Sequence, residues 1–275
     1  MFPINFIQAW FHPRKIFDRR NDFALWQLIL AFLFVNALML MPMSVQMQSI
    51  RTSPLQDYFP QAMKLVDDST VNTFHELTSI DGKTLQMDTV KVMVNADDRL
   101  LVFAPDALTE AGKRLEGKTG IIFTPSGFVI QEPKAPLITQ TYQEVETLIG
   151  AQTVSELTDS MSEQWFQDNR MAVILSRILN VSLLLTVSNL IFVLGSSVFV
   201  YLMKGYRKFD IHSYKEAVAI ALMSLGLPSL VCMVLGFWLM NPLEMITLQG
   251  IGFIIMLVWT FWVTHFNDEY NKRGV

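Results

Sequence analysis

Residues 23–45 decide the class of this protein, and they read FALWQLILAFLFVNALMLMPMSV. The stretch contains no charged side chain. An α-helix rises about 1.5 Å per residue, so a helix of this length crosses a hydrocarbon core of about 30 Å. The apolar run is longer than the core of a signal peptide, and no small-residue cleavage site follows it. The stretch therefore predicts a transmembrane helix that stays in the chain.

Three further uncharged runs lie in the last hundred residues of the sequence. They cover residues 178–203, 217–240 and 245–266. Each is longer than the roughly 18 apolar residues that indicate a spanning helix. We therefore predict an α-helical membrane protein with four transmembrane helices, 23–45 and three more within 171–266, in direct contact with the lipid bilayer.

The composition agrees with this class. Charged residues make up 17% of the chain, against about 25% in an ordinary globular protein. The single cysteine, Cys232, excludes an internal disulfide framework and a cysteine-based zinc cluster. A net charge of −4 gives no reason to expect nucleic-acid binding.

The orientation follows from the lysines and arginines near the ends of the spans. Ten of them flank the spans on one side: Arg14, Lys15, Arg19, Arg20, Lys204, Arg207, Lys208, Lys215, Lys272 and Arg273. The connection 241–244 on the other side has none. Because basic loops stay inside the cell, both termini (1–22 and 267–275) are predicted to be cytoplasmic in a multi-pass cell-membrane protein.

Residues 46–170 then form an inserted extracytoplasmic domain. The segment holds 18 acidic and 10 basic residues. Alternating apolar residues and turn chemistry predict two hairpins, 90–103 and 120–131. Asp106 is expected to cap a short helix that Gly117 ends. Helical spacing over 55–77 and 142–169 completes an α+β domain, and the last helix is expected to run directly into the second span.

The N-terminal residues form an amphipathic and basic segment. Phe2, Phe6 and Trp10 recur at helical spacing, and Arg14 and Lys15 follow them. Such a helix favours a position flat in the lipid headgroups. A helix that docks on a partner is the alternative.

The chain offers little support for catalysis. The four histidines (His12, His75, His212 and His265) are dispersed, and the sequence has no HExxH or CxxC motif, phosphate-binding glycine loop or nucleophile elbow. The acidic pairs at 67–68 and 97–98 are typical of solvated turns. We expect a protein that is not an enzyme and carries no cofactor or metal.

A polar face marks the second predicted span. Ser182, Thr186, Asn189 and Ser196 fall on one side of the helix. Uncharged polar residues commonly join neighbouring helices by hydrogen bonds, and this interpretation is favoured over a hydrophilic path for transport. In the third span, Pro228 removes a backbone hydrogen bond and predicts a kink.

The sequence also resembles a known family. The matching motifs are Ser79-Ile80-Asp81-Gly82, Ser213-Tyr214-Lys215-Glu216-Ala217 and Leu227-Pro228. With one span, an outer domain and three spans, they resemble uncharacterised bacterial four-span membrane proteins often labelled maltodextrose utilisation protein. The resemblance implies a link to carbohydrate uptake, beside a sugar ABC transporter or another membrane protein, and supplies no catalytic residues.

Two functional hypotheses follow. The first is a non-enzymatic accessory or sensing component of carbohydrate uptake that binds a partner through its outer domain or its spans. The alternative is a small transporter or channel that uses the polar face of the second span. Tyr58, Tyr142 and Trp165 are the aromatic residues of the outer segment that could stack on a sugar.

Overall fold

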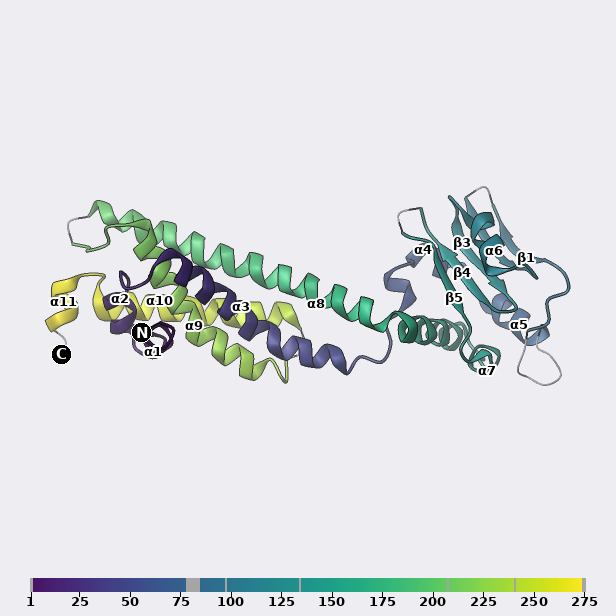
Figure 1. Ribbon diagram of the computed structural model, residues 1–275, viewed down its shortest axis with the longest axis horizontal. Helices are drawn as coiled ribbons and strands as arrows, with labels where there is room; N and C mark the ends of the chain where they lie inside the picture. Colours follow the sequence, from purple (N-terminus) through teal and green to yellow (C-terminus); the bar gives the residue numbers. More distant parts are fainter. Residues whose placement is uncertain are drawn as a thin grey trace. The chain divides into compact units, whose positions relative to one another are not determined.

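The computed structural model describes residues 2–77, 85–96, 98–133, 135–206, 208–239 and 241–273. The chain divides into two compact units. We call Met1–Ser49 with Ile174–Val275 the spanning unit, and Ile50–Val173 the sheet domain. Figure 1 shows the helices of the first unit and the strands of the second.

Four long helices account for most of the spanning unit. They are α3 (Leu25–Gln48), α8 (Val154–Leu202), α9 (Tyr214–Leu235) and α10 (Pro242–Thr264), and each is long and apolar enough to cross a membrane. The four spans predicted from the sequence are thereby confirmed as helices. Two of them begin at polar caps: for α9 Ser213 accepts a hydrogen bond from the Glu216 amide, and for α10 Asn241 accepts one from the Leu243 amide.

The second span is the last part of a much longer helix. α8 runs for 49 residues and contributes its first part to the sheet domain and its second part to the spanning unit. The prediction that the last outer helix runs directly into the second span is confirmed.

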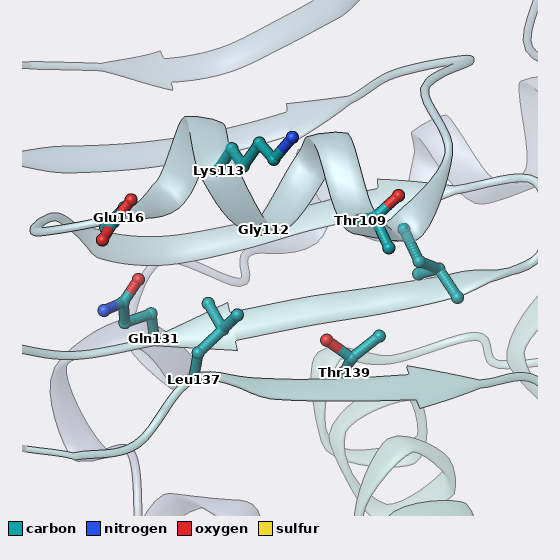
Figure 2. A pocket seen from close by; sticks show the side chains of 8 residues that line it. Thr109, Gly112, Lys113, Glu116, Gln131, Leu137 and Thr139 are labelled. Carbon is teal, nitrogen blue, oxygen red and sulfur yellow. The ribbon is translucent and has the colours of Figure 1, made fainter.

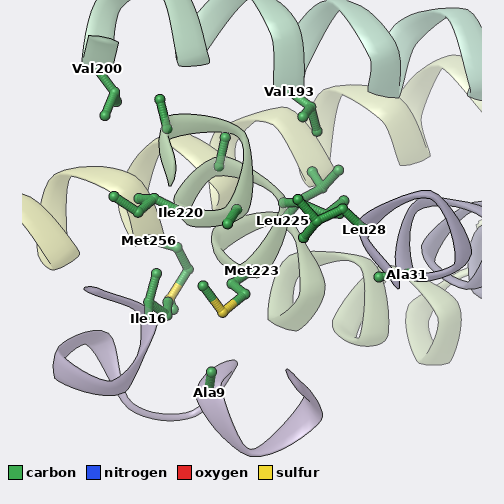
Figure 3. Packing of buried hydrophobic residues seen from close by; sticks show 14 of the residues in the cluster. Ala9, Ile16, Leu28, Ala31, Val193, Val200, Ile220, Met223, Leu225 and Met256 are labelled. Carbon is green, nitrogen blue, oxygen red and sulfur yellow. The ribbon is translucent and has the colours of Figure 1, made fainter. Parts of the chain in front are cut away.

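Helix α9 lies at the centre of the spanning unit. Its side chains from Ala219 to Leu225 are almost completely buried. Figure 3 shows Ile220, Met223 and Leu225 among residues of the other helices. At Gly226 an added Cβ would lie 2.1 Å from the Trp10 ring, so only glycine allows this close approach.

The N-terminal segment corrects one expectation. Its two short helices, α1 (Ile4–Ala9) and α2 (Pro13–Asp18), pack on the bundle, and Phe6 and Trp10 are each 1% exposed inside the protein. The prediction that this aromatic face lies flat in the lipid headgroups is therefore wrong. The helical spacing identified a face that is buried, but it did not distinguish lipid from the chain's own helices.

The sheet domain contains a mixed sheet of five strands in the order β1-β2-β3-β4-β5. The strands are Lys91–Asn95, Arg99–Phe103, Thr119–Thr124, Gly127–Gln131 and Ile138–Thr141. The two antiparallel hairpins, β1-β2 and β3-β4, are confirmed. The sequence did not predict β5, which pairs antiparallel with β4.

Helix α6 (Leu108–Leu115) connects β2 to β3, which are parallel. Its apolar side packs on one sheet face through Ala111 and Leu115. Gly117 follows the helix with a φ of +78°. This left-handed conformation commonly ends a helix, and glycine adopts it without strain. Asp106 does not cap α6, because Ala107 occupies the N-cap; Asp106 instead forms an ion pair of 2.5 Å with Arg114.

Short helices complete the sheet domain. The predicted helical region 55–77 contains η1 (Leu55–Asp57), α4 (Pro60–Met63) and α5 (Asp68–Glu76). The region 142–169 contains α7 (Val145–Ile149) and the beginning of α8. Phe74 of α5 lies edge-on against Phe103 and Phe123, whose rings stack 4.8 Å apart, and these rings form a second core.

The remaining helices lie at one end of the spanning unit. η2 (Met203–Gly205) follows α8, and α11 (Asp268–Arg273) follows α10. Figure 1 shows α1, α2 and α11 together at that end of the bundle.

Candidate functional site

A buried ionic cluster joins distant parts of the spanning unit. The Arg20 guanidinium is 3.3 Å from the Glu216 carboxylate and 2.9 Å from that of Asp268. Arg20 and Glu216 are 5% and 3% exposed. The guanidinium also donates to the backbone oxygens of Phe17 and Asp210. Every side of this buried charge thus has a hydrogen-bond acceptor, which a buried guanidinium requires.

The local sequence explains how Glu216 reaches this position. Ser213 is the N-cap of α9, and Glu216 is the third residue of the helix, as in a capping box. The Glu216 carboxylate accepts hydrogen bonds from the Ser213 hydroxyl and from the His212 amide. In the sequence this motif carries a resemblance, and its role in the ionic cluster was not predicted. The Ser-x-x-Glu spacing is the signal that could have revealed it.

The polar face of α8 is only partly buried. Asn189 is fully buried and donates to the Asn36 side chain of α3 over 3.0 Å. Ser196 donates to the backbone oxygen of Phe192 in its own helix. Ser182 and Thr186 are half-buried. The structure therefore brings Asn189 to a neighbouring span and places the other three residues along the same helix.

A second polar contact lies beside Pro228. Ser229 donates to the Leu225 oxygen, a backbone acceptor in the same turn, and accepts a 2.7 Å bond from Gln249 of α10. Helix α9 continues through Pro228. A Cβ added to Gly252 would lie 3.0 Å from the proline ring. This part of α9 is thus fixed against α10 by close packing and by one buried hydrogen bond.

A groove of about 450 Å³ lies in the sheet domain, between α6 and the strands β4 and β5. Figure 2 shows its hydrogen-bonding side chains, Thr109, Lys113, Glu116, Gln131 and Thr139. Leu108 and Leu137 supply apolar surface. The Gln131 side-chain oxygen is buried and has no hydrogen-bond partner among the described residues. This oxygen can therefore accept a hydrogen bond from a polar ligand in the groove.

The aromatic residues considered for sugar stacking lie largely in the interior. Trp165 is 4% exposed, and its ring is 4.9 Å from that of Tyr58. The Tyr142 hydroxyl is buried, and burial raises the pKa of this group above its ordinary value. Tyr58 is partly exposed at 37%. Trp165 therefore serves packing, and none of the three residues lines the groove.

The remaining candidate groups do not converge. No group of three or more histidine, cysteine, aspartate or glutamate side chains suited to a metal ion occurs among the described residues. Asp67 caps α5 and accepts from Ser69 and Thr70, and these hydrogen bonds, that from Ser69 first, lower its pKa. Asp98 is exposed, and Asp97 lies outside the described residues. Cys232 is buried among apolar residues.

Two curated proteins are similar to this chain over nearly its whole length. The maltodextrose utilization protein MalA of Streptococcus pneumoniae is 28% identical, over 98% of this chain and 99% of that protein. YvdJ of Bacillus subtilis, provisionally named a maltodextrin utilization protein, is 20% identical over 94% of this chain and 89% of its own length.

No family model matches the chain, and no solved structure matches it. Of the motifs that carried the resemblance, 213–217 comprises the N-cap and first residues of α9 and 227–228 lies within α9, whereas 79–82 lies outside the described residues. The two curated proteins confirm the resemblance stated from the sequence: the chain is similar, over nearly its whole length, to proteins named for maltodextrin utilization.

Proposed function

We propose that this chain is a non-enzymatic accessory or sensing component of maltodextrin-type carbohydrate uptake in the cell membrane. The names of its two relatives supply the carbohydrate class. The four apolar helices agree with a membrane protein. In this proposal both termini are cytoplasmic and residues 46–170 lie outside, because the basic residues flank the spans on one side.

The continuity of helix α8 is the observation that supports a sensing role. Near its beginning it is bonded to three parts of the sheet domain. Ser162 accepts from the Leu55 amide, Gln164 donates to the Glu144 oxygen, and Asp168 accepts from Gln140. The same helix continues without a break to Leu202. A change in the sheet domain that alters these bonds therefore reaches a membrane span through one backbone.

The groove beside α6 is the proposed recognition surface. Its amide, hydroxyl and charged groups suit the hydroxyls of an oligosaccharide or the polar surface of a transporter subunit. Among the described residues that line it, Glu116 is the one carboxylate. Hydrolysis of a glycosidic bond ordinarily uses a pair of carboxylates about 5–9.5 Å apart, so the lining favours binding of a saccharide over its hydrolysis.

The polar face of α8 gives less support to a transporter or channel. A hydrophilic path requires polar side chains that face water inside the bundle. Asn189 is instead fully buried and bonded to Asn36. This contact favours a packing role for the polar face.

Uptake of maltotriose by cells that lack the chain is the direct test. We expect uptake, or its induction by maltodextrin, to fall and to be restored by the wild-type chain. Unchanged uptake of maltotriose would contradict the link to carbohydrate.

A helix-breaking variant then tests whether α8 transmits changes from the sheet domain to the membrane span. Ala172 is exposed and lies at the end of the sheet domain, two residues before the spanning unit resumes at Ile174, and proline at 172 removes the helical hydrogen bond to residue 168 at a cost of about 3 kcal/mol. We expect Ala172→Pro to reach the membrane but not to restore uptake, whereas Ala172→Ser restores it. Full restoration by Ala172→Pro would exclude coupling through α8.

A further inference from the structure

An apolar groove of about 340 Å³ runs along the side of the spanning unit, between α3, α8 and α9. Its apolar walls consist of Leu25, Leu28, Ile29, Phe32, Leu190, Val193, Leu194, Val218 and Leu222. Leu28 and Val193 are each 3% exposed, and Figure 3 shows both. Leu25 and Ile29 are 64% and 54% exposed. The groove therefore has a closed floor and an open side among residues that face lipid.

The surface of this groove is almost wholly apolar, and the residues with polar groups lie at one end of it. Tyr214 and Lys215, in the first turn of α9, complete its lining. The Tyr214 hydroxyl donates to the Leu194 oxygen over 3.2 Å, which joins α9 to α8 beside the groove. The next residue, Glu216, points inward to Arg20. Lys215 forms none of the ion pairs found in the described parts of the chain.

Other cations lie at the same end of the bundle. The Lys204 ammonium is 5.4 Å from the Tyr201 ring, which in turn lies edge-on against Tyr214. Arg20, at the end of the basic N-terminal segment, is bonded to Glu216. Tyrosine and lysine side chains gather where a membrane meets water. Lys215 therefore lies at headgroup depth, and the apolar walls extend from there towards the membrane centre.

The dimensions of the groove fit a single hydrocarbon chain. From Lys215 to Leu222, α9 advances about 10 Å, two thirds of one leaflet of a hydrocarbon core about 30 Å thick. A second helix, about 10 Å wide with its side chains, is too broad for a groove of about 340 Å³ with this length.

We propose that this groove binds one anionic phospholipid, with an acyl chain between α3, α8 and α9 and its phosphate beside Lys215. The apolar walls recognise the chain, and the ammonium of Lys215 recognises the negative headgroup. Such a bound lipid fills the space between three spans and places a charged ligand next to the Arg20–Glu216 cluster.

Lipid retention by the purified full-length protein tests the proposal. The protein is exchanged into detergent with equal amounts of phosphatidylglycerol and phosphatidylcholine, and bound lipids are counted by native mass spectrometry. We expect one retained phosphatidylglycerol per chain. Lys215→Gln should lower its retention relative to phosphatidylcholine about five-fold, which is the usual effect of one basic side chain at an anionic surface.

Two further variants separate the groove from general surface charge. Lys208→Gln removes the same charge from an exposed lysine that does not line the groove, and it should retain the lipid as the wild type does. Val218→Phe fills the groove without changing a charge and should lower the retention of both lipids. Equal retention of the two lipids by the wild type, or equal losses in Lys215→Gln and Lys208→Gln, would overturn the proposal.

Discussion

The two units of this protein satisfy their buried polar groups in different ways. In the spanning unit, side chains far apart in the sequence bond to each other: Asn36 to Asn189 and Ser229 to Gln249 between helices, and Arg20, which follows α2, to Glu216 of α9. In the sheet domain, buried polar side chains bond mainly to backbone at the ends of short elements. Glu132 accepts from the amides of Gln61 and Ala62 at the start of α4.

The difference reflects the two solvents. Apolar side chains gain little by moving from lipid to a helix interface, so spans associate through close packing and polar contacts. In water, burial of rings such as those of Phe103 and Phe123 supplies the driving force. Polar contacts in the sheet domain then serve mainly to terminate elements, whereas in the spanning unit they connect helices.

The largest expected effect concerns the ionic cluster. Arg20→Ala leaves Glu216 buried without its cation, which costs about 3–5 kcal/mol. We expect a large loss of thermal stability in detergent, measured by the unfolding of the spanning unit. Arg99→Ala, which removes an exposed guanidinium in the sheet domain, should have little effect.

A double variant sharpens this test. If the cost comes from an uncompensated buried charge, Arg20→Leu combined with Glu216→Leu should be less destabilising than the sum of the two single changes. Strictly additive effects would show that Arg20 and Glu216 act independently.

Much of the fold could be predicted because its signals are local. Four uncharged runs, and hairpins with turn residues such as Ser126-Gly127, need only neighbouring positions. The contact between Arg20 and Glu216 joins residues 196 positions apart, and no periodicity reports it. The same reason explains why the aromatic N-terminal helix was assigned to lipid. The error at Asp106 is local, because α6 begins one residue later than expected, with Ala107 as its N-cap.

The functional residues were less predictable than the spans. Asn189 stood out because an amide is rare in an apolar run, but its partner Asn36 lies on another span and was not named. The groove beside α6 depends on β5, which the sequence did not predict, so its lining could not be assembled from sequence alone.

A smaller effect is expected at the cap of α5 in the sheet domain. Asp67→Ala removes the hydrogen bonds to Ser69 and Thr70 and should cost about 1 kcal/mol at neutral pH. The folded pKa of Asp67 lies below its ordinary value of 3.8, so its contribution is complete above that value and is lost as the pH falls through the folded pKa.

This pH dependence can be measured by denaturant unfolding of the wild type and of Asp67→Ala. The difference between them should shrink as the pH falls below about 3.8. A constant difference over that range would show that the carboxylate charge is not what stabilises the helix. Asp68→Ala, beside the cap, serves as the matched control, because Asp68 is not the residue that accepts from Thr70.

The smallest expected effect is at the polar face of α8. Asn189→Leu removes one bond between helices, which is worth about 0.6 kcal/mol in a membrane. We expect a slight loss of stability, equal to that of Asn36→Leu, and no change in solute flux across reconstituted vesicles. Loss of flux in Asn189→Leu would instead favour a transporter that uses this face.

The cluster around Arg20 also has a consequence for how the protein is made. Asp268 follows Arg20 by 248 residues, and the Glu216 partner also comes late in the chain. The ribosome therefore synthesises Arg20 long before it synthesises the two carboxylates that neutralise the charge of this arginine. The N-terminal segment can reach its final position only after the last helices have been synthesised, so a chain truncated after α10 retains an arginine with an incomplete set of partners.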